Sequence, residues 1–244
     1  MLKIFAKNGE LGRVNYQAIR YHNIVKYWVK LLRTNENKFS KKIYLTLVND
    51  CERYPNKKSW CSLLRDLLSS LGFYEVWLFQ DVGNDKLFLA NVKQRLHDNF
   101  IQNWNERLEN SSRALFYRNI SCFRLQPYLI SCNIKKFRFS LSRLRVSAHR
   151  LKIESGRWAR PNPIPVEQRK CNICEVLEDE YHFVLECSSY CDIRSKYIPL
   201  FYRRRPNMQK FIQLVTSDNE NVLRKLSIYV CNAFLVRSMN MCTS

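Results

Sequence analysis

Four residues in the last third of the chain have the types and the spacing of a metal site. Two cysteines separated by two residues are followed, after seven residues, by a histidine and, after four more, by a third cysteine: Cys171, Cys174, His182 and Cys187. Three thiolates and one imidazole make a soft, four-ligand set that suits tetrahedral Zn²⁺. Because four protein ligands leave no open position, we expect one structural zinc ion without a catalytic role.

The same residues leave two alternatives open. Cys191 lies four residues beyond Cys187 and would replace it if the turn after His182 were long. We favour Cys187 because a gap of four residues is usual for the last ligand pair. The other interpretation is a chance cluster of buried cysteines around a hydrogen-bonded histidine.

Charge changes sign between this motif and the segment before it. Residues 171–187 contain five acids and no Lys or Arg: Glu175, Glu178, Asp179, Glu180 and Glu186. With three thiolates and a divalent ion, this finger carries a charge of about −6 and should repel phosphates. Residues 135–170 contain eleven basic residues and two acids. We therefore expect the basic segment to contact polyanions and the finger to orient it.

The basic segment has interleaved apolar residues, which predicts an amphipathic helix that ends near Gly156. An extended connector with Pro161, Pro163 and Pro165 follows and is the clearest internal boundary by composition. The predicted nucleic-acid contacts are Arg138, Arg143, Arg145, Arg150, Lys152 and Arg157. Six aromatic residues among basic ones would stack on unpaired bases if exposed, although packing in the core is the commoner role: Tyr21, Tyr27, Trp28, Phe137, Phe139 and Trp158.

Overall composition points to the same kind of partner. A formal charge of +20 over 244 residues attracts polyanions, nucleic acid first and an anionic membrane surface second, unless an acidic partner has been lost. No apolar run reaches the roughly 18 residues of a membrane span, and the N-terminus is too charged for a signal peptide. We therefore expect an intracellular, reducing compartment, nuclear or cytoplasmic, with the ten cysteines free or metal-bound.

Helical periodicity dominates the rest of the chain. Helices are predicted over residues 16–33, 59–71, 84–109 and 221–237. Residues 39–49 form a helix or a strand, and residues 112–132 are ambiguous. Ser59 is a predicted N-cap and Gly72 a predicted stop. The expected fold is mainly α: a helical bundle in residues 1–134, then a basic helix, a small zinc-stapled CCHC finger and a C-terminal helix in residues 135–244.

One stretch of the sequence resembles a known family. Residues 144–194 read LRVSAHRLKIESGRWARPNPIPVEQRKCNICEVLEDEYHFVLECSSYCDIR. This resembles the C-terminal region of polyproteins of animal non-LTR (LINE-type) retrotransposons, where an R-x-S-x-H-x-L-x-I-E-x-G-R-W/Y segment precedes the reverse-transcriptase zinc-binding domain. Upstream, the segments GELGR (residues 9–13), RYHNIVKYWVKLL and KQRLHDNFIQNW are similar, more loosely, to the region between polymerase and finger.

The resemblance implies metal-ligand roles for Cys171, Cys174, His182 and Cys187 and implies no catalytic residue. A reverse transcriptase needs a Tyr/Phe-x-Asp-Asp hairpin to hold two Mg²⁺ ions, and this sequence has no Asp-Asp pair. We therefore expect a non-enzymatic, zinc-containing fragment that binds nucleic acid, with RNA as the first candidate. The alternatives are a protein-interaction scaffold that uses the acidic finger, and a part of an RNA-directed DNA polymerase that is active only with its missing catalytic domain.

Overall fold

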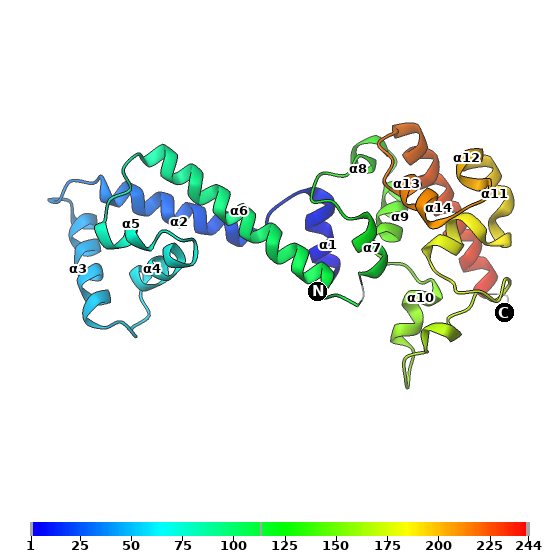
Figure 1. The fold of residues 1–244 in the computed structure, drawn as a ribbon, viewed down its shortest axis with the longest axis horizontal. Helices are drawn as coiled ribbons and strands as arrows, with labels where there is room; N and C mark the ends of the chain where they lie inside the picture. Colours follow the sequence, from blue (N-terminus) through cyan, green and yellow to red (C-terminus); the bar gives the residue numbers. More distant parts are fainter. Residues whose placement is uncertain (1, 113, 243–244) are drawn as a thin grey trace. The chain divides into compact units, whose positions relative to one another are not determined.

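The computed structural model describes residues 2–112 and 114–242 and is built of helices (Figure 1). Within those ranges there is no strand, only one isolated antiparallel bridge between Lys170 and Leu177. The expected mainly α fold is confirmed. The chain forms two compact units, which we call the central unit (residues 14–106) and the terminal unit (residues 1–13 and 107–244).

The central unit packs its helices around aromatic residues. Its helices are α2 (Tyr16–Leu32), α3 (Phe39–Arg53), α4 (Trp60–Ser70), α5 (Tyr74–Phe79) and most of α6 (Asp85–Glu109). Trp28 is fully buried, and its ring centre lies 6.2 Å from those of Trp77 and Phe88. Its indole Nε1 donates to the Tyr44 hydroxyl at 2.7 Å, so the one polar atom of this ring is satisfied inside the core.

The helices predicted in this unit are confirmed, and residues 39–49 belong to a helix, so the strand alternative is wrong. The spacing of apolar residues did not separate helix from strand here, because Ile43, Leu45 and Leu47 alternate with polar or aromatic residues as they would in a strand. In the structure Ile43 and Leu45 are exposed, whereas Tyr44 and Val48, four residues apart, are buried on one helical face.

Ser59 caps α4 as predicted, through a reciprocal capping box with Ser62.

We expect Ser59→Ala to lower the unfolding free energy of the central unit by about 1 kcal/mol, because a backbone N–H of the first turn loses its acceptor. Urea unfolding followed by tryptophan fluorescence measures this, since Trp28, Trp60, Trp77 and Trp104 all lie in this unit. Ser69→Ala, on an exposed turn of the same helix, is the control and should cost nothing; equal losses in the two variants would contradict the capping role.

The longest helix of the terminal unit is the C-terminal helix α14 (Glu220–Cys242), which is drawn red in Figure 1. Its other helices are short: α1 (Leu2–Leu11), α7 (Leu115–Ile120), α8 (Tyr128–Ser131), α9 (Lys135–Arg145), α10 (Lys152–Ser155), α11 (Cys191–Tyr197), α12 (Leu200–Arg203) and α13 (Met208–Val215), with single turns η1 (Gly156–Trp158), η2 (Val166–Gln168), η3 (His182–Glu186) and η4 (Ser188–Tyr190). Helices α8, α9, α11 and α13 pack against α14. The C-terminal helix predicted for residues 221–237 is confirmed and is longer.

The predicted basic helix does not reach Gly156. It ends at Arg145, and the chain turns through Ser147, which has a left-handed φ of 49°, before α10 begins. The reason is tertiary. Arg145 is held in a buried ion pair with Glu10, and Ser147 and His149 hydrogen-bond to Glu180 of the finger, so residues after α9 are held by partners outside the helix.

The unit boundaries also differ from the predicted division between residues 134 and 135. Helix α1 and residues 107–134 belong with the C-terminal half, because Tyr117 donates to Ala6 O and Tyr128 donates to Glu10. The proline connector is not a boundary either. Arg169 is buried and donates to the carbonyls of Ile164 and Ile153, which ties the connector to α10.

No helix in the described part of the chain is both long enough and apolar enough to cross a membrane.

Candidate metal centre

The first two predicted ligands lie on a tight turn. The N–H of Cys171 donates to Val176 O at 2.7 Å, and the N–H of Glu175 donates to Cys171 O at 3.0 Å, which folds the four residues from Cys171 to Cys174 back on themselves. Glu175 takes the left-handed conformation, with φ of 58°, that closes this turn. The C-x2-C spacing thereby directs both sulfurs to one side of the turn.

The other two ligands bracket one wide helical turn. Asp179 Oδ1 accepts from the His182 N–H at 2.8 Å and starts the turn, and His182 O accepts from the Cys187 N–H at 2.8 Å and ends it. This π-type turn, η3, spans His182 to Glu186. Its extra residue relative to an α-turn brings the ends of an H-x4-C segment to the same point.

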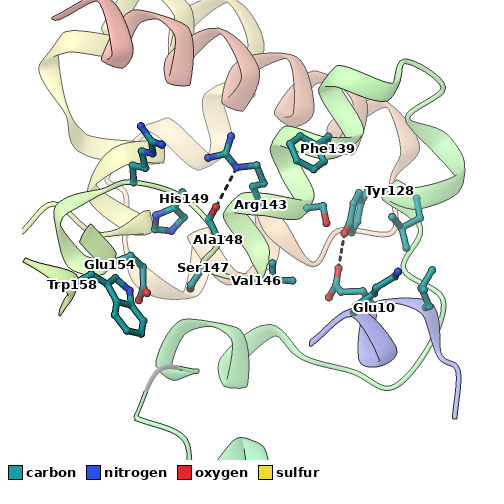
Figure 2. Close-up of a pocket in the computed structure, with 15 residues that line it drawn as sticks. Glu10, Tyr128, Phe139, Arg143, Val146, Ser147, Ala148, His149, Glu154 and Trp158 are labelled. Atoms are coloured by element: carbon teal, nitrogen blue, oxygen red, sulfur yellow. Dashed lines mark hydrogen bonds between the residues drawn. The ribbon is translucent and has the colours of Figure 1, made fainter. Parts of the chain in front are cut away.

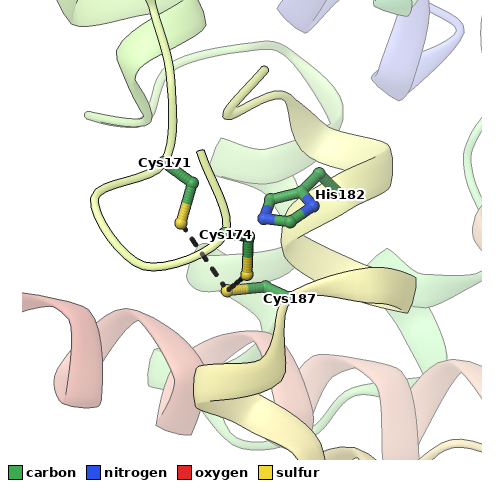
Figure 3. Close-up of side chains that lie close together, drawn as sticks. All are labelled: Cys171, Cys174, His182 and Cys187. Carbon is green, nitrogen blue, oxygen red and sulfur yellow. Dashed lines mark hydrogen bonds between the residues drawn. The ribbon is translucent and has the colours of Figure 1, made fainter. Parts of the chain in front are cut away.

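The four side chains point toward one another (Figure 3), and their ligand atoms lie within 4.8 Å of each other. Cys187 Sγ is 3.9 Å from the sulfurs of both Cys171 and Cys174. Metal–sulfur bonds of about 2.3 Å in a tetrahedron place sulfurs about 3.8 Å apart. This separation fits ligands around one ion and is far beyond the roughly 2.05 Å of a disulfide.

His182 supplies an independent indication. Its side chain is buried, and neither ring nitrogen has a hydrogen-bond partner within the residues that the structure describes. The nearest carboxylate oxygen, on Glu186, is 3.7 Å from Nδ1. Burying an imidazole without a partner costs free energy, and a metal ion would remove that cost. The interpretation of His182 as a hydrogen-bonded core histidine therefore does not describe this site.

Cys191 is not part of the cluster. It is exposed at the start of α11, while Cys187 is 2% exposed and contacts the other sulfurs. The choice of Cys187 over Cys191, which the sequence left open, is thus decided by the turn that follows His182.

The thiols differ in acidity. Burial raises the pKa of Cys187 to about 11, whereas the Ser188 hydroxyl, 3.3 Å from Cys174 Sγ, lowers the pKa of the Cys174 thiol. Metal ligands bind as thiolates, so an ion would have to displace the Cys187 proton.

The finger packs on α11 and α14. Arg194, on α11, donates to Val184 O and Cys187 O and so holds the π-type turn in place. Phe183 stacks on Phe234 of α14 with ring centres 4.9 Å apart, and its carbonyl accepts from the Tyr229 hydroxyl at 2.8 Å. The candidate ligand group therefore packs on the core of the terminal unit and does not form a separate module.

Two of the five finger acids are internal, which corrects the expectation of a uniformly acidic loop. Glu178 is buried and binds Arg237 through both oxygens, at 2.7 and 2.9 Å. Glu180 is buried and accepts from Ser147 at 2.7 Å and from the His149 ring at 2.9 Å. Burial would raise the pKa of Glu180, but these two hydrogen bonds outweigh burial and lower it, so it stays ionised. Glu175 and Glu186 remain exposed.

Glu180 links the metal ligands to the basic segment. It precedes His182 by two residues, and its two partners lie in the turn between α9 and α10. Sequence reasoning missed this link. The sequence offered one indication, since the two groups that pair lie in short polar segments on either side of the connector, RVSAH (residues 145–149) and EDEYHF (residues 178–183).

The six predicted nucleic-acid contacts have different surroundings. Arg145 is 1% exposed, and its guanidinium binds Glu10 at 3.0 and 3.1 Å and Gln126 at 2.9 Å, so it cannot reach a phosphate. Burial would lower its pKa, but Glu10 outweighs burial and raises it. Arg150 is exposed, and the remaining four are half-buried: Arg138, Arg143, Lys152 and Arg157.

Other basic residues of the segment are more accessible to a phosphate than Arg145 is. Lys135, Lys136, Arg160 and Lys170 are exposed, as Arg150 is. Arg157, by contrast, is paired with Glu154 at 3.1 Å. The exposed charge of the segment therefore lies partly on residues that the sequence pattern did not single out.

Fold and site together define a helical protein with a Cys3His group, three of whose members are buried, that could hold a metal ion. No protein-family model, curated protein or solved structure matches the chain.

Proposed function

We propose that this protein is a zinc-stapled, non-enzymatic nucleic-acid-binding region of a non-LTR retrotransposon reverse transcriptase, and that its first partner is RNA. The observation that carries the proposal is the contact between Glu180 and the turn through Ser147 and His149, because it ties the metal ligands to the basic segment. A bound zinc ion would neutralise thiolates and stabilise that turn, which is the orienting role expected of the finger.

The resemblance gains support from how its characteristic segments meet. Glu10 of the GELGR segment binds Arg145 of the R-x-S-x-H segment. Ser147 and His149 of the latter bind Glu180, which lies in EDEYHF (residues 178–183), within the stretch 144–194 that carries the resemblance. These contacts would explain why the segments occur together in the family: their polar residues form one buried network. Family membership remains part of the proposal.

The positive charge of the chain supports a nucleic acid as the partner. The chain carries +20, and exposed basic residues of the segment include Lys135, Arg150 and Arg160. Glu178 and Glu180 are buried, Glu178 in an ion pair with Arg237 and Glu180 in hydrogen bonds with Ser147 and His149. A surface of that sign binds phosphate backbones with a steep dependence on salt. The scaffold alternative is less favoured, because only part of the finger's acidic charge is available to a basic protein.

Neutralising three exposed cations should weaken RNA binding in a way that salt titration detects. For Lys135→Gln with Arg150→Gln and Arg160→Gln, we expect the slope of log K against log salt to fall by about 2, roughly 0.7 for each phosphate that is no longer neutralised. Filter binding of single-stranded RNA over a range of salt concentrations measures this slope.

The matched control removes the same charge from the central unit, at the exposed residues Lys38, Lys42 and Lys58. It should leave most of the slope intact. If both triple variants reduced the slope equally, binding would depend on total charge and the basic segment would have no special part. Binding that ignores salt would contradict the proposal altogether.

A further inference from the structure

A pocket of about 860 Å³ lies in the terminal unit, beside the turn that Glu180 holds (Figure 2). Helices α1, α8 and α9 and the residues from Val146 to Trp158 supply its lining. The turn residues Val146, Ser147 and Ala148 are part of its lining (Figure 2), and Ser147 is the residue that donates to Glu180. The pocket is thus bordered by the element that the metal ligands indirectly position.

Two large aromatic side chains of this lining face solvent. Phe139 is 61% exposed and Trp158 is 59% exposed. Trp158 is the one tryptophan of the five in the chain that is largely exposed; Trp28, Trp77 and Trp104 are buried and Trp60 is half-buried. Exposed indole and phenyl side chains beside a cavity offer stacking area that suits a flat, polarisable ligand.

Cations surround the same cavity. Lys7, Arg143 and Arg150 contribute to its lining. Arg143 is held in place, since its Nε donates to Ala148 O at 3.1 Å and its guanidinium lies 5.7 Å from the ring centres of Phe139 and Phe234. The two carboxylates of the lining are already paired, Glu10 with Arg145 and Glu154 with Arg157. The remaining balance of charge at the pocket is therefore positive.

We propose that this pocket takes an unpaired nucleobase of a single-stranded nucleic acid, with Trp158 stacked on the base and Lys7 and Arg150 near the flanking phosphates. Aromatic faces bind bases of any sequence by stacking, and cations follow the backbone. A base in a duplex is stacked on its neighbours and paired, so it could not enter. The inference rests on the proposed function and adds to it the form of the strand and the residues that hold it.

The test uses the full chain and two probes of the same sequence, a single-stranded RNA of roughly 12 nucleotides and its duplex with a complementary strand. We expect Trp158→Ala to weaken single-strand binding by about 5- to 150-fold, the usual effect of removing one stacking platform. Duplex affinity and the salt slope of single-strand binding should not change, because the substitution removes no charge. Trp158→Phe should restore most of the single-strand affinity.

A second readout does not depend on the alanine variant folding. Single-stranded RNA should quench the tryptophan fluorescence of the unmodified chain, and Trp158→Phe should abolish that quenching. Salt-dependent binding that is equally strong to both probes, unaffected by Trp158→Ala and without quenching would overturn the pocket assignment and leave the proposed function standing. Absence of salt-dependent binding to either probe would instead overturn the proposed function.

Discussion

Replacing Cys174 by serine is expected to remove the metal and unfold much of the terminal unit. Cys174 Sγ lies 3.9 Å from Cys187 Sγ, and a serine hydroxyl is a poor ligand for a thiolate-preferring ion. Structural zinc sites contribute about 10–16 kcal/mol of apparent binding free energy, which is as large as the whole stability of a typical domain at about 5–15 kcal/mol. Loss of the ion would therefore leave the unit near or below its folding threshold.

The measurement is metal content of the purified protein together with thermal unfolding by circular dichroism. The unmodified chain should hold one zinc ion, and Cys174→Ser should hold almost none and lose helical signal. Because Phe183, Val184 and Cys187 all contact residues of α11 or α14, the loss should extend beyond the finger to these helices.

Cys191→Ser is the matched control for this experiment. It changes the same atom in an exposed cysteine four residues beyond Cys187 and should retain both the metal and the melting temperature. If Cys191→Ser lost the metal as fully as Cys174→Ser, the ligand set would be wrong. A metal-free chain that still unfolds at the same temperature would show that the cluster is only a packed group of cysteines.

Removing the guanidinium of Arg145 is expected to destabilise the terminal unit by about 3–5 kcal/mol. The side chains of Arg145 and Glu10 are 1% and 4% exposed, and their ion pair joins α1 to α9. In Arg145→Met, Glu10 keeps the hydrogen bond from Tyr128 at 2.7 Å but stays buried without a countercharge. An unpaired buried charge costs much more than the pair contributes, so most of the loss comes from the carboxylate left behind.

A double variant separates this explanation from simple loss of packing. Glu10→Leu with Arg145→Met removes both charges and should recover most of the stability that Arg145→Met loses. Arg124→Ala is the control for a solvated pair, since Arg124 and Asp218 are 51% and 73% exposed, and it should cost at most about 1 kcal/mol. Urea unfolding followed by far-UV circular dichroism gives these values once the two units are fitted as separate transitions.

Equal, small losses in Arg145→Met and Arg124→Ala would mean that the ion pair between Glu10 and Arg145 has no role in holding α1. If the double variant were no more stable than Arg145→Met, the guanidinium would act mainly through the hydrogen bonds that it donates to Gln126 and Val215.

What the sequence determined by itself was local. The helices follow from apolar residues at helical spacing, and the cap at Ser59 follows from a serine at the first turn of α4, because both depend on residues a few positions apart. The candidate metal ligands could be found in the sequence for the same reason. A tight turn brings Cys171 and Cys174 together, one helical turn brings His182 and Cys187 together, and ligand chemistry joins the two pairs.

Only the tertiary structure decided which polar residues face solvent. Arg145 looks like the other basic residues around it, yet its partner Glu10 is 135 positions away, and no local pattern marks that pairing. Glu178 and Glu180 likewise look like surface acids but are buried against Arg237 and His149. Burial of a charge depends on a countercharge brought close by the fold. The break in the basic helix at Ser147, the extent of the two units and the pocket beside Trp158 all follow from those long-range contacts.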